Sequence, residues 1–210
     1  MLKLSARTEA AGMAVPLADD IWRACLPGEN ATGRPLACLV PQGARPAPGY
    51  GLYLLGAETA CETPGPALRL GPELGHIEAG DVIHVPADGR RVTVLWKNSA
   101  RHNSLLLTEQ CDNYCLMCSQ PPKDRDDSWL FDRATKVISL LPGGARALSL
   151  TGGEPTLHAD ALIGLLSHCK RVAPGLSIHL LSNGRRFTDL EFARRYAAVG
   201  LYDIMVGIPV

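Results

Sequence analysis

Three cysteines lie close together in the middle of the chain, Cys111, Cys115 and Cys118, with the spacing Cys-x3-Cys-x2-Cys. Thiolates are the usual protein ligands of iron–sulfur clusters, and a [4Fe–4S] cluster usually takes four of them. Three thiolates on one tight loop would hold three irons and leave the fourth iron open to a small molecule. A cluster with an open iron suits catalysis better than simple electron storage.

Zinc binding or inert core packing is the alternative interpretation of the same cysteines. Structural zinc sites usually have four N or S ligands and favour paired Cys-x2-Cys elements. No second Cys-x2-Cys follows in the sequence, although Cys169, His158, His168 or His179 could supply one ligand. The triple spacing arises by chance in roughly one sequence in a hundred of this cysteine content, so a cluster is the favoured interpretation.

A second group of residues, Gly152, Gly153 and Glu154, follows an apolar run and precedes Pro155. Glycines let the backbone approach a ligand closely. A carboxylate such as that of Glu154 can accept a charge-assisted hydrogen bond from an ammonium group. Alone, this motif is more often a turn before a helix. Its place one βα unit after the cysteines makes it a candidate ligand-binding motif beside the cluster.

Together the two motifs resemble the radical SAM superfamily. The resemblance implies that Cys111, Cys115 and Cys118 hold the cluster and that S-adenosylmethionine chelates the open iron through its amino and carboxylate groups. It implies that residues 152–154 contact the methionine end of this cofactor. It also implies reductive cleavage to methionine and a 5′-deoxyadenosyl radical, which then abstracts hydrogen from a substrate.

The same resemblance assigns two further cofactor contacts. Asn183, before Gly184, is similar to a family turn that faces the cofactor, although Asn-Gly is also a common plain turn. Met117 stands before the third cysteine, where the family commonly has an aromatic residue beside the adenine. An unbranched thioether can still pack on a ring.

Several other residues are expected to have ordinary roles. His158 could lie near the site, but a lone histidine is more often structural or exposed. Arg185 and Arg186 could meet a carboxylate, but a solvated pair is the default expectation. The cysteines outside the motif are expected to be small core residues; they are Cys25, Cys38, Cys61 and Cys169.

The run from Leu116 to Pro122 is similar to the C-type radical SAM maturases of the His-Xaa-Ser system, and segments 80–83 and 92–96 fit the same family. This likeness implies modification of a ribosomally made peptide with His-Xaa-Ser repeats. It implies an electron donor such as flavodoxin or ferredoxin, and companion maturase proteins. A non-catalytic metal-binding or partner-binding remnant of such an enzyme is the second class of function that the residues leave open.

Composition excludes several other classes of protein. Lys+Arg and Asp+Glu number 21 each, so no global basic field attracts nucleic acid or an anionic membrane. The N-terminus has an early acid and no long apolar run, which argues against a signal peptide. No segment reaches the length of a membrane span. An odd cysteine count, with three in ligand spacing, argues against a secreted disulfide scaffold. We expect a protein of the reducing cytoplasm.

Residues 1–102 are expected to form a small β-rich N-terminal domain of short strands and a hairpin. Pro and Gly are dense from residue 27 to 72, which favours turns and irregular connections there. Residues 16–26 are expected to form a short helix with Leu17, Ile21, Trp22 and Cys25 on one face. The domain either caps the rest of the protein or docks a peptide or partner. The expected strands are residues 36–40, 50–55, 81–85 and 91–96, with the last two joined as a hairpin.

Residues 103–210 read as an α/β repeat, which predicts a parallel sheet with right-handed crossovers. By the resemblance, this is a partial radical SAM (βα) barrel of about four units. Ligands bind at the carboxyl ends of parallel strands, where the cysteine loop, residues 152–154 and residues 182–184 all fall. The expected strands are 104–108, 147–151, 177–181 and 203–208; the expected helices run from a Ser128 cap to about 141, from 159 to 172, and from a Thr188 cap to about 199.

The sequence stops at Val210 on the fourth expected strand, whereas a barrel of the family normally has six. We therefore expect a truncated reading frame, a split gene or a fragment. We also expect this chain alone to turn over S-adenosylmethionine poorly.

Overall fold

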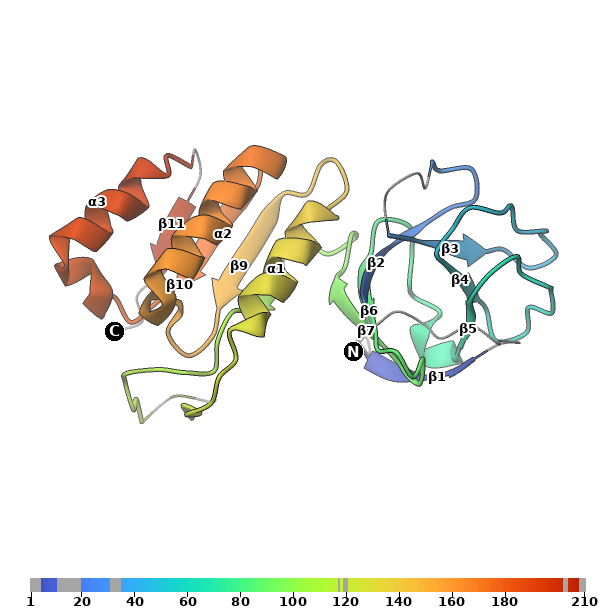
Figure 1. The fold of residues 1–210 in the computed structure, drawn as a ribbon, viewed down its shortest axis with the longest axis horizontal. Coiled ribbons are helices and arrows are strands. Elements are labelled where there is room, and N and C mark those ends of the chain that lie inside the picture. The colour runs from blue at the N-terminus through green and yellow to red at the C-terminus, as the bar shows by residue number, and fades with distance from the viewer. Residues whose placement is uncertain are drawn as a thin grey trace. The chain divides into compact units, whose positions relative to one another are not determined.

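The computed structural model describes residues 5–10, 20–30, 35–116, 118, 121–201 and 204–207. The chain divides into two compact units, residues 1–99 and 100–210. Strands dominate the first unit, and strands alternate with helices in the second (Figure 1).

The first unit is a closed β-barrel of seven strands in the order β1-β5-β4-β3-β2-β6-β7, with β7 paired back to β1. The β2–β3, β3–β4 and β4–β5 pairs are parallel and the others are antiparallel. Closure of the barrel removes exposed strand edges. The strands are β1 (Ser5–Ala10), β2 (Asp20–Cys25), β3 (Leu36–Val40), β4 (Leu52–Leu55), β5 (Ala67–Leu70), β6 (Val82–Val85) and β7 (Arg91–Trp96), with a 3-10 helix η1 (Pro72–Leu74) after β5.

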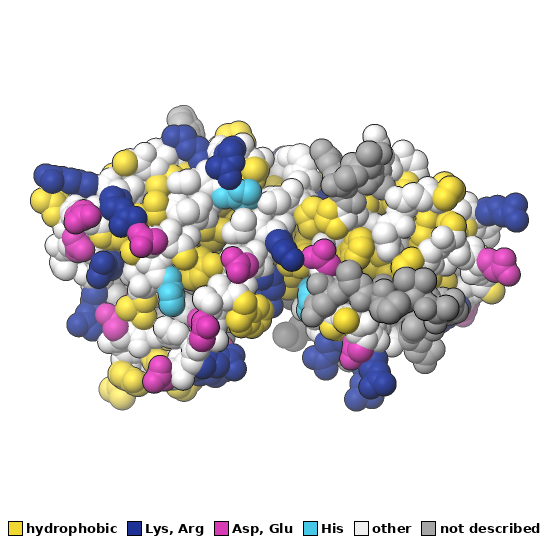
Figure 2. Space-filling model, viewed as in Figure 1, with side chains coloured by type: hydrophobic (Ala, Val, Ile, Leu, Met, Phe, Trp, Pro, Cys, Tyr) yellow, Lys and Arg dark blue, Asp and Glu magenta, His cyan; other side chains and the backbone are white. Residues whose placement is uncertain are grey.

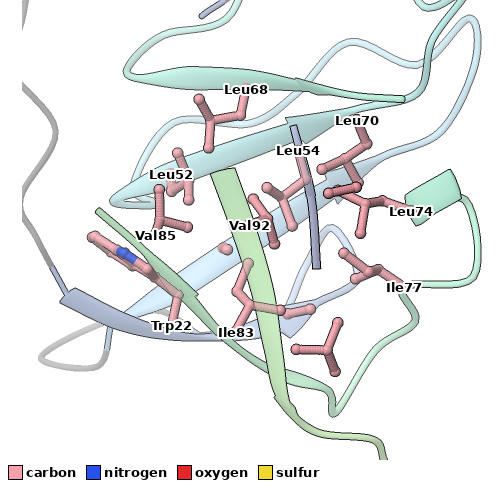
Figure 3. Close-up of a cluster of buried hydrophobic side chains, with 14 residues drawn as sticks. Trp22, Leu52, Leu54, Leu68, Leu70, Leu74, Ile77, Ile83, Val85 and Val92 are labelled. Carbon is pink, nitrogen blue, oxygen red and sulfur yellow. The ribbon is translucent and has the colours of Figure 1, made fainter. Parts of the chain in front are cut away.

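Apolar side chains from opposite walls fill the interior of this barrel (Figure 3). Trp22 of β2, Leu54 of β4 and Ile83 of β6 are all buried there. The Trp22 ring lies directly against Gly51, where an added Cβ would come within 2.4 Å of a ring carbon. Only glycine fits at position 51 without moving the indole.

The predicted helix over residues 16–26 is wrong in its described part, because Asp20–Cys25 form strand β2. This strand pairs with β3 on one side and β6 on the other, so its backbone hydrogen bonds are made within the sheet. Strand pairing here overrides the apolar spacing that suggested a helix. The strands predicted at 36–40 and 91–96 are confirmed, those at 50–55 and 81–85 begin later than expected, and β1 and β5 were missed.

The second unit is a parallel sheet of four strands in the order β11-β10-β9-β8. Helices α1, α2 and α3 connect consecutive strands, and α1 and α2 lie over one face of the sheet (Figure 1). Over the described residues this sheet is open. The elements are β8 (Asn103–Leu106), α1 (Trp129–Ser139), β9 (Ala147–Thr151), η2 (Pro155–His158), α2 (Ala159–Val172), β10 (Ser177–Leu181), η3 (Arg185–Thr188), α3 (Leu190–Ala198) and β11 (Ile204–Gly207).

The strand register puts apolar side chains in one row across the sheet. Leu105, Leu150 and Leu180 are register partners across β8, β9 and β10, and all three are buried. Their neighbours Ser149 and His179 form an alternate row, because successive side chains of a strand point to opposite faces. Parallel register also brings the carboxyl ends of the strands to one edge, where the loops that carry the motifs begin.

Two helix starts differ from their predicted caps. The Ser128 side chain makes no capping hydrogen bond at α1. At α3 the cap is Asp189 instead of Thr188, and its carboxylate accepts the N–H groups of Glu191 and Phe192. The helix predicted at 159–172 is confirmed, with its four predicted apolar residues buried.

The described residues contain no helix long and apolar enough to span a membrane. On the face shown in Figure 2, basic and acidic side chains are interspersed. That distribution agrees with the equal number of basic and acidic residues in the sequence.

Candidate active site

The three motif cysteines lie on the loop between β8 and α1. Cys111 is half-buried, and Cys115 and Cys118 are exposed. The N–H of Cys118 donates to the carbonyl of Cys115 at 3.0 Å, and the N–H of Asn113 donates to the Cys111 sulfur at 3.4 Å. The structure describes all seven cysteines, and none of them forms a disulfide. Met117, the predicted adenine contact, lies outside the described residues.

Gly152, Gly153 and Glu154 follow β9 and lie against the start of this loop. The N–H of Gly153 donates to the carbonyl of Thr108 at 2.8 Å, and that of Glu154 to the carbonyl of Gln110 at 2.7 Å. A Cβ on Gly153 would lie 2.1 Å from the Gln110 carbonyl oxygen and 3.1 Å from the Cys111 Cβ. The two motifs therefore meet backbone to backbone, and the contact requires glycine.

The Glu154 carboxylate is a buried acceptor within the protein, with its residue only 1% exposed. Its Oε1 accepts from the Thr156 N–H at 2.9 Å, the Thr156 hydroxyl at 2.6 Å and the Ser182 hydroxyl at 3.0 Å. Its Oε2 accepts from the Asn183 N–H at 2.5 Å. In this structure Glu154 ties the turn after β9 to the turn after β10. Its predicted contact with an ammonium group remains a prediction.

Asn183 lies beside the cysteine loop. Its side-chain amide donates to Oδ1 of Asp112 at 2.7 Å. Arg185 donates to the Asp112 carbonyl at 3.0 Å and to the Asn113 side-chain oxygen at 2.9 Å. The side chains of Arg185 and Arg186 are exposed, as expected for a solvated pair, and Arg185 also meets the Asp112 carboxylate at 3.5 Å.

Sequence reasoning assigned no role to two buried polar residues at the base of the loop, Thr108 and Asp127. Thr108 and Asp127 are hydrogen-bonded to each other across the base of the loop. Asp127 stands just before α1 and Thr108 just after β8, so each resembles an ordinary element terminus. Their pairing is visible only once the loop is closed.

Donor chemistry and placement decide whether these residues fit an iron–sulfur cluster. The described residues include no group of three or more Cys, His, Asp or Glu side chains already converged on one point. Three cysteines in no disulfide nevertheless share one loop, and thiolates are the ligands that such clusters require. The glycine pair lets the start of the loop pack directly on the turn after β9. The residues fit the cluster in type, and they share one loop.

The profile of the radical SAM superfamily matches residues 105–210, and the chain belongs to that superfamily. Proteins of this superfamily use a [4Fe–4S] cluster and S-adenosylmethionine for radical chemistry. The chain is also similar to a probable GTP 3′,8-cyclase of Thermococcus kodakarensis, with 30% identity over 108 residues. The match covers 49% of this chain and 33% of that protein, so the chain spans about a third of its relative's length. No solved structure matches the chain.

Proposed function

We propose that Cys111, Cys115 and Cys118 hold a [4Fe–4S] cluster and that residues 152–154 receive the methionine end of S-adenosylmethionine. The observation that supports this most directly is the contact between the two motifs, with the Gly153 N–H bonded to Thr108 and its Cα packed against Gln110. When bound, the reduced cluster supplies the electron that cleaves the cofactor to methionine and a 5′-deoxyadenosyl radical.

The protein's own residues would bind and orient the cofactor and shield it from solvent. The glycine pair lets the start of the cysteine loop pack backbone to backbone on the turn after β9, which would hold Cys111 beside residues 152–154. The buried Glu154 carboxylate fixes the turns after β9 and β10, on which Gly153 and Asn183 lie. Asn183 bonds to the loop through Asp112 and accepts the N–H of Arg185, so it would support the loop beside the proposed ligand. The resemblance adds Met117 as an adenine contact.

We further propose that the four-stranded sheet is part of a (βα) barrel and that the substrate is a ribosomally made peptide with His-Xaa-Ser repeats. The support is the similarity of the run from Leu116 to Pro122 to the C-type maturases. An electron donor such as flavodoxin or ferredoxin, companion maturase proteins and a reducing cytoplasmic setting belong to the same proposal. The first unit would then serve as a cap or a docking domain.

A nucleotide substrate is the second candidate, and the similarity to a probable GTP 3′,8-cyclase favours it. The two candidates share the cluster and the cofactor and differ only in the molecule that loses hydrogen. A non-catalytic remnant would bind the cluster without cleaving the cofactor. One series of assays can therefore separate all three.

The experiment begins with anaerobic reconstitution of the full chain. We expect about four irons and four sulfides per chain, loss of both in Cys115→Ala, and retention in Cys61→Ala, whose cysteine lies outside the loop. 5′-Deoxyadenosine is then measured under dithionite with a His-Xaa-Ser repeat peptide, with GTP, or with neither. Stoichiometric zinc without iron–sulfur absorbance would contradict the cluster. Stimulation by GTP instead of the peptide would contradict the peptide substrate.

A further inference from the structure

The cysteine loop is closed at its base by a buried carboxylate, that of Asp127. Oδ1 of Asp127 accepts from the Thr108 hydroxyl at 2.9 Å, and Oδ2 accepts from the Glu109 N–H at 2.5 Å. Asp127 is 1% exposed and Thr108 is fully buried. A buried carboxylate is costly unless it is hydrogen-bonded, and bonds to an ionised acceptor are the strong ones. Asp127 therefore holds together two chain segments about twenty residues apart.

Outer contacts at the loop base are exposed and weaker. Glu109 pairs with Lys123 and Arg125, and the N–H of Lys123 donates to the Glu109 carbonyl at 2.9 Å. Exposed ion pairs contribute little on their own, because water screens them and long side chains lose freedom. The buried contact of Asp127 is therefore expected to contribute more to the closed base than these exposed ion pairs do.

Thr108 links this closure to the rest of the site. Its hydroxyl oxygen also accepts the N–H of Gln110 at 3.0 Å, and its carbonyl accepts the N–H of Gly153. On the other side, the backbone carbonyl of Asp127 accepts the N–H of Leu130 and so begins α1. One buried residue therefore joins the start of the loop, its end and the following helix.

We propose that Asp127 is a positioning residue, which holds the cysteine loop in the shape that receives the cluster. The proposal rests on the proposed function, because it takes Cys111, Cys115 and Cys118 as the cluster ligands. Three thiolates must converge on one cluster, and a loop whose ends are already joined loses less freedom when they do. Loss of the closure should therefore weaken cluster uptake while leaving the sheet folded.

The test compares Asp127→Asn, Thr108→Val and Thr108→Ser with wild type and with the control Asp124→Asn, an exposed acid of the same loop. In Asp127→Asn an NH2 group replaces one carboxylate oxygen, and that group cannot accept a hydrogen bond. Val removes the Thr108 hydroxyl, and Ser restores it. Two quantities are measured: the alkylation rate of each loop cysteine in folded apo protein, by mass spectrometry, and iron and sulfide per chain after anaerobic reconstitution. Circular dichroism and the thermal midpoint of the apo protein report on folding.

We expect alkylation at least about tenfold faster in Asp127→Asn and Thr108→Val, because losing one buried hydrogen bond costs about that factor and Thr108→Val loses two. Iron content should fall below half in both variants, whereas Thr108→Ser and Asp124→Asn should match wild type. A wild type that binds no cluster would contradict the proposed function, and the alkylation rates would still test the closure. If Asp127→Asn and Thr108→Val show the alkylation rates and iron content of wild type, the positioning role of Asp127 is overturned. That result would leave the proposed function untouched. If Asp127→Asn does not fold, Thr108→Val against Thr108→Ser decides; an unfolded Thr108→Val would overturn the proposal, because the contact would then support the whole unit.

Discussion

The side-chain amide of Asn183 donates a hydrogen bond of 2.7 Å to the carboxylate of Asp112, the residue directly after Cys111, although 71 residues separate them. Arg185 adds two bonds to the same stretch, one to the Asp112 carbonyl and one to Asn113. The turn after β10 is thus hydrogen-bonded to the cysteine loop near Cys111. A residue predicted to meet the cofactor is also a support of the loop that would carry the cluster.

Arg185→Ala should loosen the loop near Cys111, whereas Arg186→Ala should not. Arg185 bonds to the loop, while its neighbour Arg186 pairs with Asp189 on its own turn. Because these bonds are exposed, we expect the free energy of unfolding to change by less than about 1 kcal/mol in both variants. Alkylation of Cys111, followed by mass spectrometry, should be about threefold faster in Arg185→Ala only. Equal rates in the two variants would show that the guanidinium contact does not restrain the loop.

Glu154→Gln should lower the free energy of unfolding by about 1–3 kcal/mol. The amide NH2 of glutamine would replace an oxygen that now accepts a buried hydrogen bond, so two donors would face each other. Glu191→Gln, at an exposed helix position, should stay within about 0.5 kcal/mol of wild type. Urea denaturation measures both. Under the proposed function the same variant should bind S-adenosylmethionine more weakly with unchanged iron content, and an equal loss of iron would assign Glu154 a structural role only.

Gly153→Ala and Gly164→Ala should change stability in opposite directions. A Cβ at position 153 would lie 2.1 Å from the Gln110 carbonyl oxygen, and that backbone is held by further bonds. We expect a loss of about 1–3 kcal/mol together with poor cluster uptake. Gly164 lies exposed in α2 with nothing within 4 Å of a built Cβ, so alanine there should stabilise by about 0.5–1 kcal/mol. Thermal unfolding of the two variants beside wild type checks the signs, and a neutral Gly153→Ala would contradict the close contact of the motifs.

Alkaline pH should destabilise the protein through its buried thiols. Burial raises the pKa of Cys169 from 9.0 to about 12. Burial, followed by the neighbouring Cys38, raises the pKa of Cys25 to about 12 as well. Because the unfolded chain ionises these thiols first, their contribution is intact below about pH 9 and is lost as the pH rises toward 12, by about 1 kcal/mol per thiol at pH 10.

Urea denaturation of wild type, Cys169→Ala and the control Cys61→Ala at pH 8 and pH 10 measures this effect. Cys169→Ala should lose less stability between the two pH values than wild type does, whereas Cys61→Ala should follow wild type. An identical loss in wild type and Cys169→Ala would mean that Cys169 does not titrate on unfolding.

Local pattern was enough for much of the second unit. The apolar periodicity predicted α2 from Ala159 to Val172 and its buried face, and short apolar runs predicted β9 and β10 at their observed bounds. The spacing of Cys111, Cys115 and Cys118 indicated the superfamily that the profile match then showed. These features depend on residues a few positions apart, so they can be read along the chain.

Contacts over long separations were decided only by the tertiary structure. The sequence by itself determined which residues carry the motifs and that the loops after three parallel strands share one edge. It did not determine that Asp127 closes the cysteine loop, that the Glu154 carboxylate is buried between two turns, or that Arg185 reaches Asp112. The physical reason is that such bonds depend on the order and register of the strands and on which polar groups burial leaves without water. For the same reason Asp20–Cys25 became a strand, because β3 and β6 pair with it on both sides.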